Sequence, residues 1–594
     1  MSLEKIGEKS LYNKKADAHM DSWKSDIEEA IGEDPRELGI HNREELENRL
    51  KRTYQLFSER KELDFIKNLK EINDEVGVYL VGGSVRDAIL GKDSKDIDLV
   101  INRIEPIQLV DVLADFGEIT FDRNPKADIK RMESSEKENL IKNSYGVIKF
   151  KPNGSRLKEL IDIAFPREDD YSGSGQSGIR GIKRDTETKA DHNLNINRDL
   201  ERRDFTINAI AINLANGEII DPFDGIEDLI KRKIRTVGSP VERIINEDFS
   251  RGFRALRFAC IFNTDIESGT KKAIKEIFKP SEKSAQEIYH NNPELLSKVL
   301  NYEEKVKQQF VQPEGNLPKC LQVFWDKEQG KPRMAVAKEV MSKEILKAID
   351  ARPGKLIKLL DEIGGLKIIL PEIFNLKNLE QPRKFHGEGD VFKHTLMLLN
   401  NLPLNASLRL KLAGLLHDTG KVDTLSKTKE GKITFHRHEQ ASTQYVTNVA
   451  ERFRFSDKLK KGTEFLVKNH MLPLRDAKEM KPNKLYNIFL KDKILGNELI
   501  SLARADALAS LPEKGEPDLE NINILIDRLK DIKQRFNDQD KIEIPKIITG
   551  EDVIILGIKR GPLVGKILAE VQEAQLDGRI KSRDEAIDLI KKYA

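Results

Sequence analysis

The order of hydrophobic and polar residues changes along the chain and predicts two kinds of structure. Up to about residue 237, apolar runs of strand length (VGVYLV from residue 76, DIDLVI from 96, GVIKF from 146) alternate with helix-like stretches. After residue 246 the apolar residues recur almost wholly at helical spacing. We therefore predict an α+β multidomain protein in which a mixed-sheet head precedes all-α domains and C-terminal helices.

The length of 594 residues is too great for one hydrophobic core and predicts about three or four domains. We place a charged N-terminal extension at 1–66 and the mixed-sheet head at 67–237. A helical neck and body, with an insertion, follows at 238–375. A second helical domain occupies 376–535, and a helical segment occupies 536–594.

Composition adds few constraints. The chain has 102 Lys and Arg against 100 Asp and Glu, so any nucleic-acid surface must be a local one. Its two cysteines, Cys260 and Cys320, exclude a disulfide framework and a Cys-rich zinc site. No apolar run approaches the roughly 18 residues of a membrane span, and the N-terminus has no signal-peptide core. We expect a cytoplasmic protein that does not enter membranes.

A turn at Gly82, Gly83 and Ser84 separates an apolar strand from a helix. Two glycines let the backbone approach a ligand closely, and the free N–H groups at a helix start favour phosphate. The turn fits neither GxGxxG nor GxxxxGK[ST], so it does not support a Rossmann or Walker site.

Three aspartates stand in predicted strands near this turn. Asp96 and Asp98 share one strand face, because side chains alternate, and Asp162 projects from the polar face of LIDIAF. The alternative is a solvated strand face, but aspartate is a poor strand former. Three carboxylates beside a phosphate turn suit two Mg²⁺ ions and nucleotidyl transfer, with Asp96, Asp98 and Asp162 as catalytic residues.

A row of charged residues at three-residue spacing comes later, on a predicted helix. It consists of Asp248, Arg251, Arg254 and Arg257. An Asp acceptor beside an Arg donor can read the base edge shared by adenine and cytosine, and further arginines can bind triphosphate. The spacing alone favours the alternative, an ordinary i, i+3 salt bridge on a helix surface.

Four ordered motifs resemble the class II CCA-adding tRNA nucleotidyltransferase and poly(A) polymerase family. They are GGSVRD with DIDLV, RRDFTINA, IIDPFDGIEDL and EDFSRGFRALRF. The resemblance implies that Asp96 and Asp98 hold metal and that Asp248 and Arg251 pair with the incoming base. It also implies a nucleotide site made of Gly83, Arg86, Arg203, Asp204, Asn208, Arg254 and Arg257.

Six of the ten histidines lie between His386 and His470. The spacing of a His, an adjacent His-Asp pair and a later Asp resembles the HD phosphohydrolase superfamily. This implies a divalent metal of unknown identity held by His394, His417, Asp418 and Asp506, with a second metal at His438 and His470. His386 and His436 match no ligand position, and a degenerate HD fold without activity is the alternative.

The two resemblances together imply an enzyme that adds CCA to the 3′ end of tRNA from CTP and ATP without a template. The head would use Mg²⁺, and an HD domain with phosphohydrolase activity would occupy 376–535. A poly(A) polymerase and an enzyme limited to CC or A addition remain open, because these enzymes share the motifs. An HD phosphohydrolase with an RNA-binding head and a non-catalytic RNA-binding protein are the alternatives from other classes.

Overall fold

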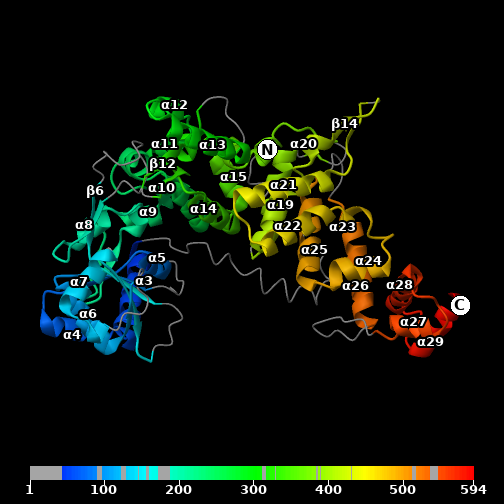
Figure 1. The fold of residues 1–594 in the computed structure, drawn as a ribbon, viewed down its shortest axis with the longest axis horizontal. Coiled ribbons are helices and arrows are strands. Elements are labelled where there is room, and N and C mark those ends of the chain that lie inside the picture. The colour runs from blue at the N-terminus through cyan, green and yellow to red at the C-terminus, as the bar shows by residue number, and fades with distance from the viewer. Residues whose placement is uncertain are drawn as a thin grey trace. The chain divides into compact units, whose positions relative to one another are not determined.

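The computed structural model describes residues 43–89, 97–121, 129–144, 146–154, 160–170, 187–310, 316–327, 329–382, 386–387, 389–403, 405–429, 431–511, 517–535 and 546–593. They form two compact units that divide between Ile369 and Leu370 (Figure 1). The domain boundaries that we place within them remain predictions.

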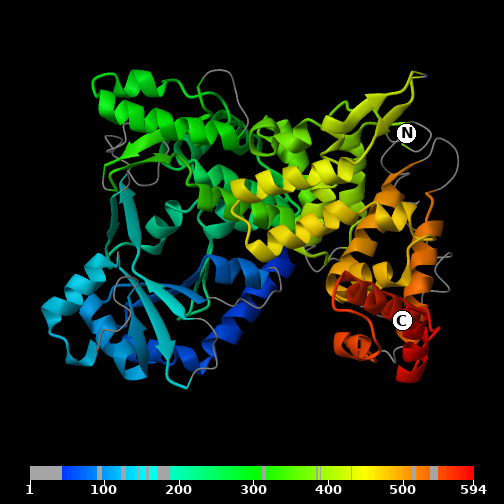
Figure 2. The same cartoon turned by 45° about the vertical axis from the view of Figure 1, so that its right-hand side comes forward.

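The first unit is built on a seven-stranded sheet, as predicted for the head (Figure 2). Its strand order is β3-β4-β5-β2-β1-β8-β9, and β2 and β5 are parallel while the other neighbours are antiparallel. The sheet is therefore mixed. The strands are β1 (Gly77–Val81), β2 (Ile97–Asn102), β3 (Gly117–Thr120), β4 (Val147–Pro152), β5 (Ile161–Ala164), β8 (Ala211–Asn213) and β9 (Ile219–Ile220).

Helices enclose the buried side of this sheet. Ile97, Leu99 and Ile101 of β2 are buried, and among the helices that pack around the sheet are α4 (Phe65–Ile72), α5 (Gly83–Ile89) and α6 (Pro106–Phe116). The side chain of Asp98 is only half-buried, as the predicted alternation requires. The opposite face carries Asp98 and also a second apolar cluster, which includes Val81, Val100 and Leu200.

Part of the predicted N-terminal extension is a helix that packs against the head. Residues 1–42 lie outside the described residues, but α3 (Arg43–Ser58) packs against α5 and against α9 (Gly225–Ile230). Leu46 and Leu50 are fully buried, because their four-residue spacing places both on one face of α3. The predicted boundary at residue 66 therefore falls inside a packed unit.

The sheet leads into the helical neck. Helix α10 (Ser250–Phe262) packs against α14 (Lys338–Ala351) and α15 (Pro353–Glu362). The segment between them, predicted to be polar and inserted, contains α11 (Ser268–Ile277), α12 (Ala285–Tyr289), α13 (Pro293–Gln309) and the hairpin of β12 (Val323–Asp326) and β13 (Lys331–Met334). The insertion therefore has a folded structure of its own.

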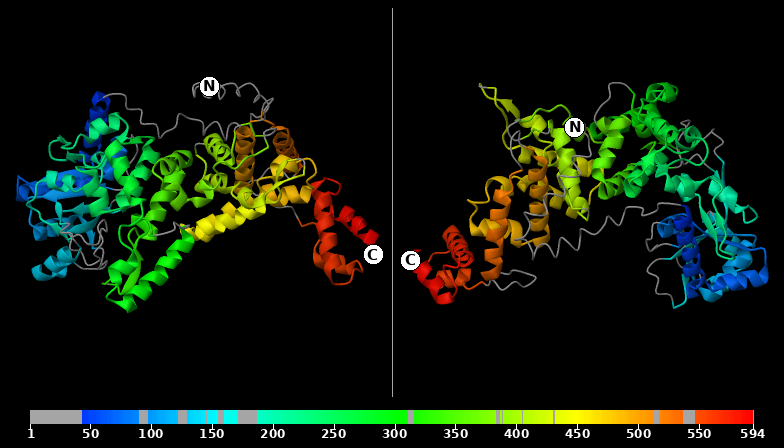
Figure 3. Two further views of the ribbon diagram at one scale, coloured as in Figure 1. Left: turned by 90° about the horizontal axis from the view of Figure 1, so that it is seen from above. Right: turned by 180° about the vertical axis from the view of Figure 1, so that it is seen from behind.

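The second unit is almost wholly helical, as predicted. Its main helices are α18 (Val391–Asn401), α19 (Leu408–Leu416), α21 (His438–Arg452), α22 (Asp457–Asn469), α25 (Lys493–Ala509) and α26 (Glu520–Arg535). A short hairpin of β14 (Leu425–Lys427) and β15 (Ile433–Phe435) precedes α21. Helices α27 (Gly550–Ile555), α28 (Pro562–Leu576) and α29 (Arg583–Ile590) share a small core of their own (Figure 3). Among the described residues, none of the helices is both long and apolar enough to span a membrane.

Candidate functional site

Two of the three predicted catalytic carboxylates are neighbours on one face of the head sheet. Asp98 on β2 and Asp162 on β5 stand directly opposite each other in the parallel pairing. The Asp98 N–H donates a hydrogen bond to Ser84 Oγ at 3.1 Å, which ties the strand to the turn after β1. Lys149 on β4 stands opposite Asp162, a neighbour that the sequence did not reveal. Asp96 lies outside the described residues.

The glycine turn lies against this carboxylate. Gly82 has a φ of 66°, a conformation that favours glycine. A Cβ atom at Gly82 would lie 3.1 Å from Nη1 of Arg203 and 3.4 Å from Oδ2 of Asp98. A Cβ at Gly83 would lie 3.6 Å from the same Asp98 oxygen. The structure thus gathers Gly82, Gly83, Asp98 and Arg203 at one place.

Arg203 is held by a buried carboxylate that sequence reasoning missed. Asp199, on α8 (Ile196–Glu201), accepts hydrogen bonds from Nη2 of Arg203 at 2.9 Å and from Nε and Nη2 of Arg202 at 2.9 and 2.8 Å. Burial alone would raise the pKa of Asp199, but the two guanidinium groups lower it. The i, i+3 and i, i+4 spacing of Asp199 to these arginines was the available signal.

Four of the predicted nucleotide-site residues form one hydrogen-bonded chain. Nη1 of Arg86 donates to Oδ1 of Asn208 at 3.1 Å, Nδ2 of Asn208 donates to Oδ1 of Asp204 at 2.8 Å, and Nε of Arg254 donates to Oδ2 of Asp204 at 2.6 Å. Burial would raise the pKa of Asp204, but Arg254 and the Asn208 amide hold it below its usual value. Asp204 therefore stays ionised and anchors the chain.

The predicted base-reading residues differ in detail from the expected row. Asp248 is extended and precedes α10, because a π-helix (Val241–Glu247) ends directly before it, so Asp248 does not share a helix with Arg251. Both side chains are buried, and the N–H of Arg251 donates to the Asp248 carbonyl at 3.2 Å. The Arg251 guanidinium forms an ion pair with Glu247, which the sequence did not single out.

Arg257 is also engaged by a glutamate from outside the motifs. Its guanidinium forms an ion pair with Glu344 on α14 and lies 4.0 Å from the centre of the Phe258 ring. Arg86 and Arg254 lie 5.3 and 5.7 Å from the same ring. Three of the predicted nucleotide-binding arginines thus lie around the Phe258 ring.

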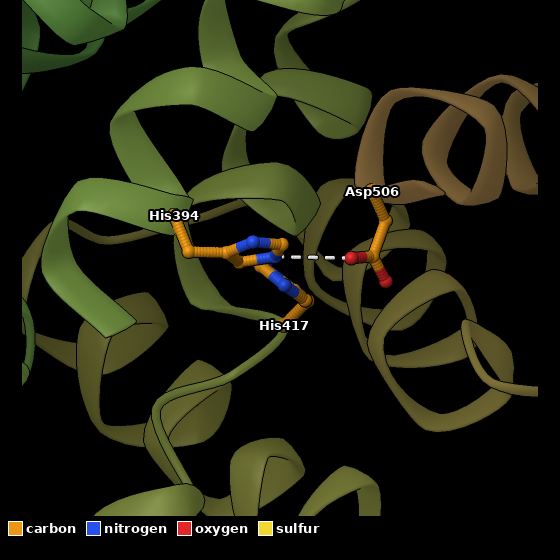
Figure 4. Close-up of side chains that lie close together, drawn as sticks. All are labelled: His394, His417 and Asp506. Carbon is orange, nitrogen blue, oxygen red and sulfur yellow. Dashed lines mark hydrogen bonds and ion pairs between the residues drawn. The ribbon is translucent and has the colours of Figure 1, made fainter. Parts of the chain in front are cut away.

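The histidine cluster of the second unit contains two groups of side chains that could hold a metal. The first is His394, His417 and Asp506, whose ligand atoms all lie within 4.8 Å of one another (Figure 4). Nε2 of His394 lies 3.0 Å from Oδ1 of Asp506. All three side chains are buried and come from three places, α18, the end of α19, and α25.

The second group is Asp418, His438 and His470, also within 4.8 Å of one another. The sequence assigned Asp418 to the first metal, whereas its Oδ1 lies 3.2 Å from Nε2 of His438 and its Oδ2 lies 3.1 Å from Nε2 of His417. Asp418 therefore stands between the two groups. Burial would raise its pKa, but His417 and Lys421 hold that pKa well below the usual value.

Three of the imidazoles are oriented in the same way. Nδ1 of His417, His438 and His470 each donates to the carbonyl three residues earlier, at 2.9, 3.0 and 2.7 Å. A carbonyl can only accept, so Nδ1 carries the hydrogen and Nε2 faces the cluster. Nε2 of His417 is buried and makes no hydrogen bond. This orphaned nitrogen, among carboxylates, fits a cation.

The charge states of the second group agree with a cation site. Burial first, with neighbouring histidines, lowers the pKa of His470 to about 3, so its imidazole is neutral. Burial would also lower the pKa of His438, but Asp418 raises it overall. Nε2 of His438 lies 3.2 Å from Nε2 of His470 and 3.2 Å from Oδ1 of Asp418, so the three side chains that would hold a metal converge.

Two residues beside the cluster were not predicted. Nζ of Lys421 lies 2.8 Å from Oδ2 of Asp418 and donates to Oε1 of Gln381 at 2.7 Å. His386, predicted to be no ligand, stacks edge-on against His394 at 5.2 Å between ring centres, and His436 is exposed. The sequence signal for Lys421 is its position three residues after Asp418.

Comparison with known proteins agrees with this geometry. Residues 78–235 match the poly(A) polymerase head domain, and residues 391–511 match the HD domain. The chain therefore contains a poly(A) polymerase head domain and an HD domain. This confirms the predicted family. The A-adding tRNA nucleotidyltransferase of Deinococcus radiodurans is 27% identical over 70% of this chain and 84% of that protein.

The multifunctional CCA protein of Neisseria meningitidis serogroup A is 28% identical over 70% of this chain and 76% of its own length. Among solved structures, the Bacillus stearothermophilus CCA-adding enzyme in complex with CTP has a TM-score of 0.50. The likeness extends over 89% of this chain and 96% of that chain at 17% identity, and it supports the fold of the poly(A) polymerase head and its helical continuation.

Proposed function

We propose that the poly(A) polymerase head adds CCA to the 3′ end of tRNA from CTP and ATP. The observation that carries the proposal is the in-register pair Asp98 and Asp162 beside the Gly82 turn and Arg203. Relatives named as CCA and A-adding enzymes support tRNA as the acceptor. The A-adding relative keeps addition of A alone as the second candidate.

The carboxylates of Asp98 and Asp162, with Asp96, are suited to hold Mg²⁺. Bound Mg²⁺ would supply activation of the tRNA 3′-hydroxyl and neutralisation of the departing pyrophosphate. The chain's own residues provide the remaining functions. Nε of Arg203 is buried without a hydrogen bond, which leaves one of its donors for a phosphate beside the turn.

The cationic side of the pocket orients the nucleotide. Arg86 and Arg254 are joined through Asn208 and Asp204, so their guanidinium groups are fixed before a triphosphate arrives. Preorganised donors stabilise developing phosphate charge without rearrangement during the reaction. Asp248 and Arg251 lie next to this chain and remain our proposed base-reading pair.

Purified protein should be given tRNA that lacks CCA, and tRNA that ends in CC, with each NTP singly and in pairs. CCA addition predicts two C residues with CTP alone and completion when ATP is added. Extension of only the tRNA ending in CC would instead identify an A-adding enzyme. Long A tracts with ATP alone would refute the proposal, and Asp98→Asn should abolish every addition.

We further propose that the HD domain is a metal-dependent phosphohydrolase that acts on phosphate at RNA ends. The support is the pair of metal-suited groups, with Asp418 of the second group 3.1 Å from His417 of the first, and the Nε2 of His417 that makes no hydrogen bond. The variant His417→Ala with Asp418→Ala should lose Mn²⁺-dependent hydrolysis of 2′,3′-cyclic phosphate RNA ends and retain nucleotide addition. Equal hydrolysis by this variant and wild type would refute the assignment.

A further inference from the structure

The β14–β15 hairpin is an exposed basic element beside the two metal-suited groups of the HD domain, which we call the HD centre. From Leu425 to Arg437 the sequence has four cationic residues, Lys427, Lys429, Lys432 and Arg437, and one acidic residue. All four cations are exposed. Figure 1 shows the hairpin projecting beyond α20 (Lys421–Thr424) and α21.

Packing does not explain this hairpin. Its strands have three residues each, every residue of β14 is exposed, and those of β15 are only half-buried. A two-stranded ribbon of this size is marginally stable without a packed face. The hairpin therefore contributes little to the stability of the domain, and it presents its cations to solvent.

The C-terminal end of the hairpin, at Phe435, is tied to the metal-suited side chains. The Phe435 carbonyl accepts the Nδ1 hydrogen of His438, and Nζ of Lys421 lies 5.3 Å from the centre of the Phe435 ring. The same Nζ lies 2.8 Å from Oδ2 of Asp418. The exposed cations of the hairpin are thus linked through Phe435 and Lys421 to the cluster.

A third contact places a hairpin lysine beside the segment that precedes α18. Nζ of Lys427 lies 3.9 Å from Oε2 of Glu380, next to Gln381. Because a lysine ammonium only donates, the atom of Gln381 that faces Lys421 is Oε1. Nε2 of Gln381 is left buried without a hydrogen-bond partner, a spare donor at the base of the hairpin.

We propose that the β14–β15 hairpin binds the phosphate backbone of RNA and presents its 3′-terminal phosphate to the HD centre. The proposal rests on the phosphohydrolase function proposed above. RNA is favoured over an acidic protein because the cations lead to a centre suited to phosphate esters, and because successive phosphates match successive cations along an extended ribbon.

The test compares Lys427→Ala/Lys429→Ala/Lys432→Ala with a control of equal charge change on α22, Lys458→Ala/Lys460→Ala/Lys461→Ala. Both are assayed with Mn²⁺ on a 2′,3′-cyclic phosphate RNA oligonucleotide and on bis(p-nitrophenyl) phosphate. The hairpin variant should raise KM for RNA about tenfold and reduce the slope of log KM against log salt by about 2, since each lost single-strand contact removes about 0.7. Its activity on the small ester should change less than about twofold, and the control should resemble wild type.

The outcomes separate the two proposals. If wild type hydrolyses neither substrate, the phosphohydrolase function fails. If wild type hydrolyses both and the hairpin variant matches it on RNA, the hairpin proposal fails. Competition by polyglutamate as strong as that by RNA would also overturn the assignment of RNA. Circular dichroism of each variant verifies that its fold is retained.

Discussion

Asp199 shows how a buried carboxylate can fix the position of a residue that we propose to bind the nucleotide. It is fully buried, and it bonds Arg203 with one oxygen and Arg202 with the other. Arg203 in turn lies against the Gly82 turn. The position of a nucleotide-site guanidinium is thereby set by a carboxylate on α8.

We expect Asp199→Asn to raise KM for the incoming nucleotide about 10- to 100-fold, because a hydrogen bond to a charged group is worth about 1.5–3 kcal/mol. The kcat should fall less, since Asp98 and Asp162 are unchanged. Steady-state kinetics with tRNA in excess measures the effects on KM and on kcat separately. Arg202→Ala is the control, as it leaves the Arg203 bond in place. A loss of stability with unchanged KM would show a purely structural role.

Asp204 gives the stability of the head a dependence on acid. Its pKa is lowered in the fold, so its stabilising effect is present above its unfolded pKa of about 3.9 and is lost as pH falls through the lower, folded value. We expect the free energy of unfolding to fall less steeply below about pH 4 in Asp204→Asn than in wild type. Urea titrations across this pH range measure the free energy of unfolding of both proteins. Parallel pH curves would contradict the prediction.

At the scale of elements, the turn between β1 and α5 combines a backbone requirement with a contact requirement. Gly82 and Gly154 both have a φ of 66°, but a Cβ at Gly154 would meet nothing within 4 Å. The two positions therefore separate the cost of the left-handed conformation from the cost of crowding Arg203 and Asp98.

We expect Gly82→Ala and Gly154→Ala each to lower stability by about 1–2 kcal/mol, because a Cβ disfavours this conformation. Only Gly82→Ala should also reduce kcat/KM for nucleotide addition, by at least about tenfold, since about 1.4 kcal/mol of lost contact suffices. Thermal unfolding and NTP incorporation measure the two effects. Equal activity of both variants would show that the turn is not part of the nucleotide site.

At the scale of the whole molecule, the sequence predicted what local periodicity determines. The alternation of Ile97, Leu99 and Ile101 predicted the strand face that carries Asp98, and the resemblance of a His, a His-Asp pair and a later Asp to the HD superfamily predicted the histidine cluster. Contacts between distant segments were not predictable, as with Glu344, which lies 87 residues from Arg257. The π-helix before Asp248 was also missed, because sequence spacing does not distinguish it from an α-helix.

The metal-suited side chains all lie in the second compact unit, so we expect metal binding there to leave nucleotide addition by the head unchanged. We expect His470→Gln to lower the Mn²⁺ content by about one ion per chain, since metal sites need their full ligand set. Elemental analysis after dialysis measures the content, and nucleotide addition should be retained. His436→Gln, an exposed position, is the control. An unchanged Mn²⁺ content in His470→Gln would contradict the assignment of the second group.

The parallel pairing of β2 with β5 has a consequence for how this protein can change over evolutionary time. Asp98 and Asp162 are opposite each other, so main-chain hydrogen bonding, at a strand spacing of about 4.8 Å, fixes their separation. The chain between them can lengthen or shorten without moving either carboxylate. Changes of length between β2 and β5 are thus changes that selection on catalysis would scarcely register, and new surface properties can arise there while the chemistry is inherited intact.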